Sequence, residues 1–201
     1  MFHLLNYPLS LQLMKWIGDR VSFKDHKDSV TFVIYPPQVG MKRTVVLIWF
    51  ILWILIGGYV TTQFFYDYSD KEKIALFVFM AFWLYFAVRV LKTLLYLFKG
   101  REYIKVDQTA LRVKKATGQY GKAKQYFLEN LSKLKVVEMN SRSFQKVFED
   151  SAWVKGTDRI QFEYMGKHYS FGRKLNEKDA KLMFQIITKR IDKFLKKKEK
   201  G

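Results

Sequence analysis

Two long apolar segments, residues 44–66 and 74–98, dominate the pattern of hydrophobic and polar positions along the chain. The first contains 23 residues and no charged side chain. As an α-helix it would be about 34 Å long, and the hydrocarbon core of a bilayer is about 30 Å thick. The second segment is of similar length, and only residues 67–73 separate the two. The pattern therefore predicts a transmembrane helical hairpin over residues 44–98.

The charges around this hairpin predict its orientation. Lys42 and Arg43 precede the first helix and further basic residues follow the second, whereas the turn contains Asp67, Asp70 and Glu72. Basic residues are enriched on the cytoplasmic side of membrane helices. We therefore expect both ends of the chain to be cytoplasmic and the acidic turn to lie on the other side of the membrane.

Small residues in the first helix indicate where another helix can approach it. Gly57 and Thr61 are four positions apart, as are Gly58 and Thr62. Small residues at this spacing allow close contact between membrane helices. The contact is expected between the two helices of the hairpin, and an interface between copies of the chain is the alternative.

The second helix carries one polar face within its apolar sequence. Its members are three or four positions apart and so share one side of the helix: Tyr85, Arg89, Lys92, Tyr96 and Lys99. Arg89 would lie about 22 Å along the helix from Ile74, inside a core of about 30 Å. The face is either an anchor whose arginine reaches the inner headgroups, or a contact surface for a partner or a lipid headgroup.

Residues 1–43 are predicted to be a cytoplasmic segment with one helix and one strand. Over residues 8–21 the apolar side chains, including Trp16, fall on one side, which suits a helix in the membrane interface or docked on another subunit. Residues 29–35 (SVTFVIY) are β-branched and aromatic, which predicts a strand that Pro36-Pro37 ends. Because a lone strand is not stable, it should pair with the C-terminal domain or with another protein.

Residues 99–201 are predicted to form one domain of short antiparallel strands and a final helix. Asn176 is a cap for this helix, and the apolar stripe that follows predicts that it packs on the sheet: Ala180, Met183, Phe184, Ile187, Ile191, Phe194 and Leu195. Alternating or β-rich runs between turn signals predict the strands, which we place at residues 103–106, 111–114, 124–128, 134–139, 159–165 and 168–171.

The last hairpin and helix of this domain carry a resemblance to a known fold. The sequence FEYMGKHYSFGRKLNEKDAKLMFQII ends a strand with Phe171-Gly172, continues with Leu175 and opens a capped helix at residues 176–179. This resembles the pleckstrin-homology-like fold of bacterial membrane proteins. Over residues 44–196 the chain is similar to small proteins with two membrane helices before such a domain. The resemblance implies an α+β membrane protein of the bacterial inner membrane, with six or seven strands and a C-terminal helix.

Composition adds a strong positive charge. The net charge is +18, and residues 99–201 supply +14 of it, from 26 Lys or Arg against 12 Asp or Glu. Attraction to the anionic membrane face is favoured over nucleic-acid binding because a membrane anchor precedes the domain. Six basic residues of its first strands correspond to the headgroup-binding region that the resemblance implies: Lys105, Arg112, Lys114, Lys115, Lys122 and Lys124. General attraction to anionic lipid is favoured for these six over specific headgroup binding, because a two-span anchor makes lipid-dependent recruitment redundant.

Residues that would indicate an enzyme or a metal site do not gather in the sequence. There is no cysteine, and His3, His26 and His168 are far apart, with no partner at metal-ligand spacing. We therefore predict no catalytic residues, no metal and no cofactor. The expected function is that of a non-enzymatic accessory subunit or scaffold with membrane-protein partners. A sensor of anionic lipid and, less favoured, a membrane tether for nucleic acid are the alternatives.

Overall fold

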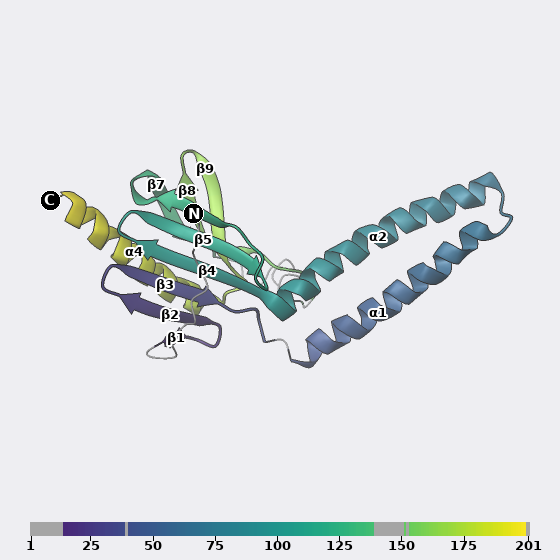
Figure 1. Cartoon of the computed structure of the whole chain (residues 1–201), viewed down its shortest axis with the longest axis horizontal. Coiled ribbons are helices and arrows are strands. Elements are labelled where there is room, and N and C mark those ends of the chain that lie inside the picture. Colours follow the sequence, from purple (N-terminus) through teal and green to yellow (C-terminus); the bar gives the residue numbers. More distant parts are fainter. Residues whose placement is uncertain (1–13, 39, 139–150, 152, 200–201) are drawn as a thin grey trace.

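The computed structural model describes residues 14–38, 40–138, 151 and 153–199, and it shows an α+β protein in two parts. A long helical hairpin extends from one end of a domain that contains β-strands and a C-terminal helix (Figure 1). The strands form one sheet of six and one of three, all antiparallel. The coarse fold class expected from the sequence is therefore confirmed.

The hairpin consists of α1 (Met41–Thr62), the short 3₁₀ turn η1 (Gln63–Phe65) and α2 (Asp70–Lys99). Both helices are long and apolar enough to cross a membrane, and nearly all of their side chains face outward. The first turn of α2 is closed by Ser69 and Glu72: the Glu72 carboxylate accepts hydrogen bonds from the Ser69 backbone N–H at 2.9 Å and hydroxyl at 2.7 Å. Such a box satisfies groups that a helix start leaves unpaired.

The two helices meet closely at Gly57. A Cβ atom on Gly57 would lie 2.1 Å from the ring of Trp83, so only glycine fits there. The Trp83 indole donates a hydrogen bond to the Trp53 carbonyl oxygen at 2.9 Å, and Trp53 donates to the Trp83 carbonyl oxygen at 3.4 Å. Gly58, by contrast, has open space around it. The predicted close approach is thus present at Gly57 and absent at Gly58.

The six-stranded sheet contains strands from both sides of the hairpin. Its order is the order of the chain: β1 (Lys15–Ile17), β2 (Val21–His26), β3 (Ser29–Ile34), β4 (Gly100–Asp107), β5 (Ala110–Thr117) and β6 (Ala123–Phe127). Strands β3 and β4 are neighbours, with Ser29 opposite Asp107 and Ile34 opposite Glu102. The membrane hairpin is therefore an insertion between two paired strands of one domain.

The N-terminal segment differs from the predicted helix. Residues 15–17 form β1, and the chain turns at Gly18, whose φ of +55° does not continue a helix, before β2 begins at Val21. Pairing of β1 with β2 provides backbone partners that a helix would otherwise supply, and Ile17 and Val21 are buried in the domain core. The interfacial helix over residues 8–21 is therefore wrong for its described part, and residues 8–13 lie outside the described residues.

The predicted strand before the membrane is confirmed, and so is its partner. It is β3, and it pairs with β4 of the C-terminal domain. The domain boundaries expected at residues 43 and 99 lie at the ends of the helical hairpin. The six-stranded sheet, however, contains strands from before and after the hairpin.

The second sheet and the last helix close the core of the domain. This sheet contains β7 (Leu131–Val136), β8 (Asp158–Tyr164) and β9 (Lys167–Arg173), and α4 (Glu177–Glu199) follows it. The expected strands are all present, although β7 ends three residues earlier than predicted, with an irregularity at Lys133, whose φ is +49°. One apolar cluster contains residues from both sheets and the buried stripe of α4.

The cap predicted for the last helix is confirmed. The Asp179 backbone N–H donates to Asn176 Oδ1 at 2.7 Å, and Asn176 Nδ2 donates to the Asp179 carboxylate at 2.9 Å. Ala180, Met183 and Ile187 of the predicted stripe are fully buried. This face of the helix therefore supplies part of the core rather than an exposed surface.

The strands give the domain two ends. The hairpin leaves the domain where β3 ends and β4 begins, and we call this the membrane-proximal end. Three turns also lie at this end: residues 18–20, 118–122 and 174–176. The turns at residues 27–28, 108–109 and 165–166 lie at the opposite, distal end. The view in Figure 1 follows this arrangement, with the hairpin on one side and the C-terminus on the other.

The insertion predicts that the domain can fold without its membrane hairpin. Replacing residues 36–100 by Asn-Gly would join Tyr35 to Arg101 through a two-residue turn of the kind that connects paired strands. We expect a soluble chain with one cooperative thermal transition, measured by circular dichroism. A fragment of residues 100–201, which lacks β1–β3, should show none. A cooperative transition in that fragment would contradict the insertion.

The glycine contact predicts a difference between two neighbouring positions. Gly57→Val should destabilise the hairpin by about 1–3 kcal/mol, as overpacking does, because the new side chain overlaps Trp83. Gly58→Val is the matched control and should have little effect, since its surroundings are open. Unfolding of the full chain in a series of SDS concentrations measures both. Equal losses in the two variants would show that the helices do not meet at Gly57.

Candidate functional site: the junction between membrane and domain

The membrane hairpin is joined to the domain without a linker on one side. Helix α2 ends at Lys99 and strand β4 begins at the next residue, Gly100. A Cβ atom on Gly100 would lie 2.3 Å from the Tyr96 ring, so the last turn of the helix packs directly on the start of the strand. The Gly118 backbone N–H also donates to the Lys99 carbonyl oxygen at 2.8 Å. The direction of α2 is therefore fixed relative to the sheet.

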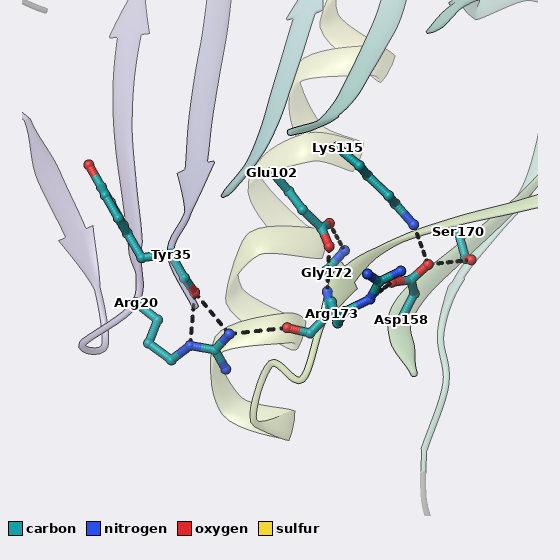
Figure 2. A network of polar contacts seen from close by, with 8 residues as sticks. All are labelled: Arg20, Tyr35, Glu102, Lys115, Asp158, Ser170, Gly172 and Arg173. Atoms are coloured by element: carbon teal, nitrogen blue, oxygen red, sulfur yellow. Dashed lines mark hydrogen bonds and ion pairs between the residues drawn. The ribbon is translucent and has the colours of Figure 1, made fainter. Parts of the chain in front are cut away.

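Arg20 connects three segments at this junction. Its Nε and Nη2 atoms donate to the Tyr35 carbonyl oxygen at 3.1 and 2.9 Å, and Nη2 also donates to the Arg173 carbonyl oxygen at 3.2 Å (Figure 2). Nη1 donates to the Lys174 carbonyl oxygen. Burial lowers the pKa of Arg20, whereas its contact with Tyr96 of α2 acts in the opposite direction. The turn before β2 is thus tied to the end of β3, to the turn after β9 and to the membrane helix.

Glu102 has a buried carboxylate that accepts hydrogen bonds from backbone N–H groups at the same junction. Its oxygens accept hydrogen bonds from the backbone N–H groups of Gly172 at 2.8 Å and Arg173 at 3.3 Å (Figure 2). These bonds join β4 of the first sheet to β9 of the second. Burial raises the pKa of Glu102, and the nearby charge of Asp158 raises it further.

Asp158 contacts the remaining charged side chains of the network, Lys115 and Arg173. It accepts hydrogen bonds from Lys115 Nζ at 2.5 Å and from the Ser170 hydroxyl at 2.8 Å, and Arg173 Nε lies 3.4 Å away (Figure 2). With Glu102, the network holds two carboxylates and two basic side chains, so it is close to neutral. Paired and hydrogen-bonded charges are the form in which burial is tolerated. We interpret this network as a connection between the sheets.

The hollows of the described surface lie elsewhere. One is an open depression on α4, lined by Glu177, Lys181 and Leu182, and another lies at the tip of the hairpin beside Tyr68 and Glu72. Neither touches the network. Within the described ranges, no group of three His, Asp or Glu residues is placed to hold a metal ion. Neither of these two depressions therefore makes the network part of a pocket.

The polar face predicted on α2 divides into two parts. The Arg89 guanidinium donates to the Tyr85 hydroxyl at 2.8 Å and lies 5.6 Å from the centre of its ring. Both side chains are exposed, as are those of Lys92 and Lys99. Tyr96 is instead 6% exposed, beneath the guanidinium of Arg173. Tyr96 therefore belongs to the junction, and the exposed face consists of the other four residues.

The six predicted headgroup contacts do not form one surface. The register places Lys105, Arg112 and Lys114 on the outer face of the six-stranded sheet, whereas Lys115 and Lys124 are on the face toward the second sheet. Arg112 pairs with Asp107 at 2.8 Å. Lys115 is held by Asp158, and Lys124 lies over the Tyr169 ring at 6.0 Å. Lys122 alone of the six lies in a turn of the membrane-proximal end.

Sequence reasoning did not identify Arg20, Glu102, Asp158 or Arg173 as junction residues. A signal existed for Glu102, because it occupies a position that alternates inward with Ile104 and Val106 in β4. A charged residue at an inward position of a strand needs a buried partner. The groups that satisfy it, the Gly172 and Arg173 N–H, are 70 and 71 residues away, and no local pattern indicates them.

Comparison of the chain with protein-family models, curated proteins and solved structures gives no match. The resemblance to pleckstrin-homology-like proteins therefore stays a prediction. The junction is described by its own geometry: a direct connection from α2, one of two helices long and apolar enough to span a membrane, to a basic domain.

The raised pKa of Glu102 predicts a pH dependence of stability. A folded state that binds the proton more tightly than the unfolded state loses stability as the pH rises, from the ordinary value of 4.5 up through the raised pKa. Glu102→Gln removes the titrating carboxyl, so the stability of wild type relative to Glu102→Gln should fall as the pH rises above 4.5. Thermal unfolding of the full chain in detergent measures the difference. A constant difference over this range would contradict the assignment.

A second substitution separates charge from hydrogen bonding at the same position. Glu102→Leu removes both acceptors and leaves the Gly172 and Arg173 N–H groups unpaired, which costs about 1–3 kcal/mol per buried group. Glu102→Gln keeps one acceptor oxygen. Glu102→Leu should therefore be the less stable variant at every pH, and equal stability would show that these bonds do not hold β4 to β9.

Proposed function

We propose that this protein is a non-enzymatic accessory subunit or scaffold of a larger complex in the bacterial inner membrane. Its basic domain would contact partner proteins on the cytoplasmic side, with both ends of the chain on that side. The basic residues beside the hairpin ends and the acidic turn between its helices support this orientation. A pleckstrin-homology-like domain, expected from the resemblance to have six or seven strands, suits the role; residues 99–201 contain the six strands β4–β9 followed by α4, and β1–β3 add three more.

The observation that carries this proposal is the direct passage from α2 into β4. A fixed orientation favours a protein that presents a binding surface to a partner. A docking platform gains much, because binding then does not have to order the domain. The contacts of Arg20 and Gly118 hold the same passage from two sides. The chain therefore presents its domain at a set angle to the membrane.

The two alternative functions receive less support from the geometry. The basic residues predicted to read lipid headgroups are divided between opposite faces of the sheet, and two of them are paired with carboxylates. Recognition of nucleic acid requires a basic surface that follows a phosphate backbone. The described cations instead include several that are neutralised within the domain. Protein contact remains the function that we propose.

A flexible junction tests the proposal. Insertion of Gly-Ser-Gly-Ser between Lys99 and Gly100 leaves the paired strands intact but frees the domain from α2. We expect recovery of a co-purifying partner from gently solubilised membranes to fall about tenfold, which corresponds to 1.4 kcal/mol of binding free energy. The partner is identified first with the wild-type chain, by mass spectrometry.

The matched control is the same insertion between Gly40 and Met41. A linker already connects β3 to α1 there, so partner recovery should stay at the wild-type level. Equal recovery with both insertions would mean that the hairpin acts as a simple tether. If no protein co-purifies with the wild-type chain, the scaffold function is wrong.

A further inference from the structure

Trp153 brings part of the domain to the membrane boundary. Its ring lies edge-on to the ring of Trp49 in α1, with 4.7 Å between ring centroids. The segment that carries it is held to the end of β9: Lys174 Nζ donates to the Ser151 carbonyl oxygen at 2.6 Å, and the Lys174 N–H donates to the Thr157 carbonyl oxygen at 3.0 Å. A loop of the domain is thus fixed against a membrane helix.

The depth of this contact follows from the length of the hairpin. The twenty residues from Val46 to Phe65, at the outer end, span about 30 Å as a helix, which matches the hydrocarbon core. Val46 packs on Val90 and Leu94 of α2, so these three residues mark the inner boundary. Trp49 is one turn inside it. Tryptophan is enriched at such boundaries, where its ring is half in lipid.

Two lysines lie beside this boundary with no ion-paired carboxylate among the residues that the structure describes. Lys92 lies between Val90 and Leu94 in sequence and is exposed. Lys155 is two residues after Trp153, and it is partly buried near Arg173 and Lys92, whose charges, after burial itself, lower its pKa. Within the described parts of the chain, no ion pair joins a carboxylate to Lys92 or Lys155.

The nearby carboxylates are already engaged. Asp158 accepts hydrogen bonds from Lys115 and Ser170 and forms an ion pair with Arg173, and Glu102 accepts hydrogen bonds from two backbone N–H groups. Cations that repel one another at a partly buried site are stabilised by an added anion. The ammonium groups of lysine are common ligands of phosphate.

We propose that Lys92 and Lys155, beside the Trp49–Trp153 pair, bind the phosphate of an anionic phospholipid in the leaflet that faces the domain. The lipid supplies an anion where the described residues offer none, and its acyl chains continue along the apolar surface of the two helices. Free phosphate offers the same charge without the apolar part. The tryptophan pair at the boundary favours the lipid, because it contacts headgroup and chain together.

Stability of the purified full chain tests this site, because a ligand that binds the folded state raises the unfolding temperature. The chain in an uncharged detergent is titrated with short-chain phosphatidylglycerol, with phosphatidylcholine of the same chain length, or with inorganic phosphate. We expect phosphatidylglycerol alone to raise the unfolding temperature in a saturable way. An equal rise with phosphatidylcholine or with inorganic phosphate would overturn the proposal of an anionic-lipid site.

Charge-matched variants locate the site. The double variant Lys92→Gln, Lys155→Gln should bind phosphatidylglycerol about tenfold more weakly or worse, the effect of two lysines close to an anionic surface. Lys24→Gln, Lys105→Gln removes the same charge from the outer face of the sheet and should bind like wild type. Equal weakening in both would show general attraction and overturn the site.

A conservative variant separates a loss of lipid binding from a loss of folding. Lys92→Arg, Lys155→Arg keeps both charges and should retain binding, even if the glutamine variant is less stable without lipid. Loss of binding in the arginine variant as well would overturn the phosphate contact. The outcome is independent of the scaffold function, because it requires no partner protein.

Discussion

The pairing of β3 with β4 is the constraint on which the rest of this structure depends. Two neighbouring strands are about 4.8 Å apart, whereas two packed helices are about 8–10 Å apart. An insertion of two membrane helices between such strands must absorb this difference on at least one side. The chain does so before α1, with residues 35–40, and leaves α2 continuous with β4. One helix therefore sets the orientation of the domain, and the other completes the hairpin by packing on it through Gly57 and Trp83.

The buried charges follow from the same constraint. Where the hairpin leaves the sheet, several turns end together, and their backbone groups cannot all pair in strand ladders. Arg20 satisfies three carbonyl groups there, and Glu102 satisfies two N–H groups. Burying these charges costs free energy, but removal of either one would leave its partners buried and unpaired. The network thus favours one arrangement of sheet, turn and membrane helix over others of similar hydrophobic burial.

Much of the fold could be predicted from the sequence because its signals are local. Long uncharged runs indicate the hairpin, alternation around Asp107–Thr109 indicates β4 and β5, and Asn176 with its apolar stripe indicates α4. The failures concern non-local or short features. Strand β1 has three residues, too few for a period of two to outweigh a helical pattern. The bonds from Glu102 to Gly172 and from Arg20 to Lys174 join positions that only the folded chain brings together. Basic residues could be counted from the sequence, but the face that each occupies depends on the strand register.

This distribution of faces changes the meaning of the net charge. A basic domain beside a membrane helix suggests an extended cationic surface, yet Lys115 and Arg173 are directed into a nearly neutral network and Arg112 is paired with Asp107. Among the described residues, Lys92 and Lys155 are cations of the junction with no ion-paired carboxylate, at the depth where we propose a lipid phosphate. Positive charge near a membrane helix is needed for its orientation in any case. In our proposal, the direct connection of α2 to β4 adds a second effect, because it keeps Lys92 and Lys155 at one depth. At that depth the charge of the nearby lipids, rather than the net charge of the domain, determines what the two lysines contact.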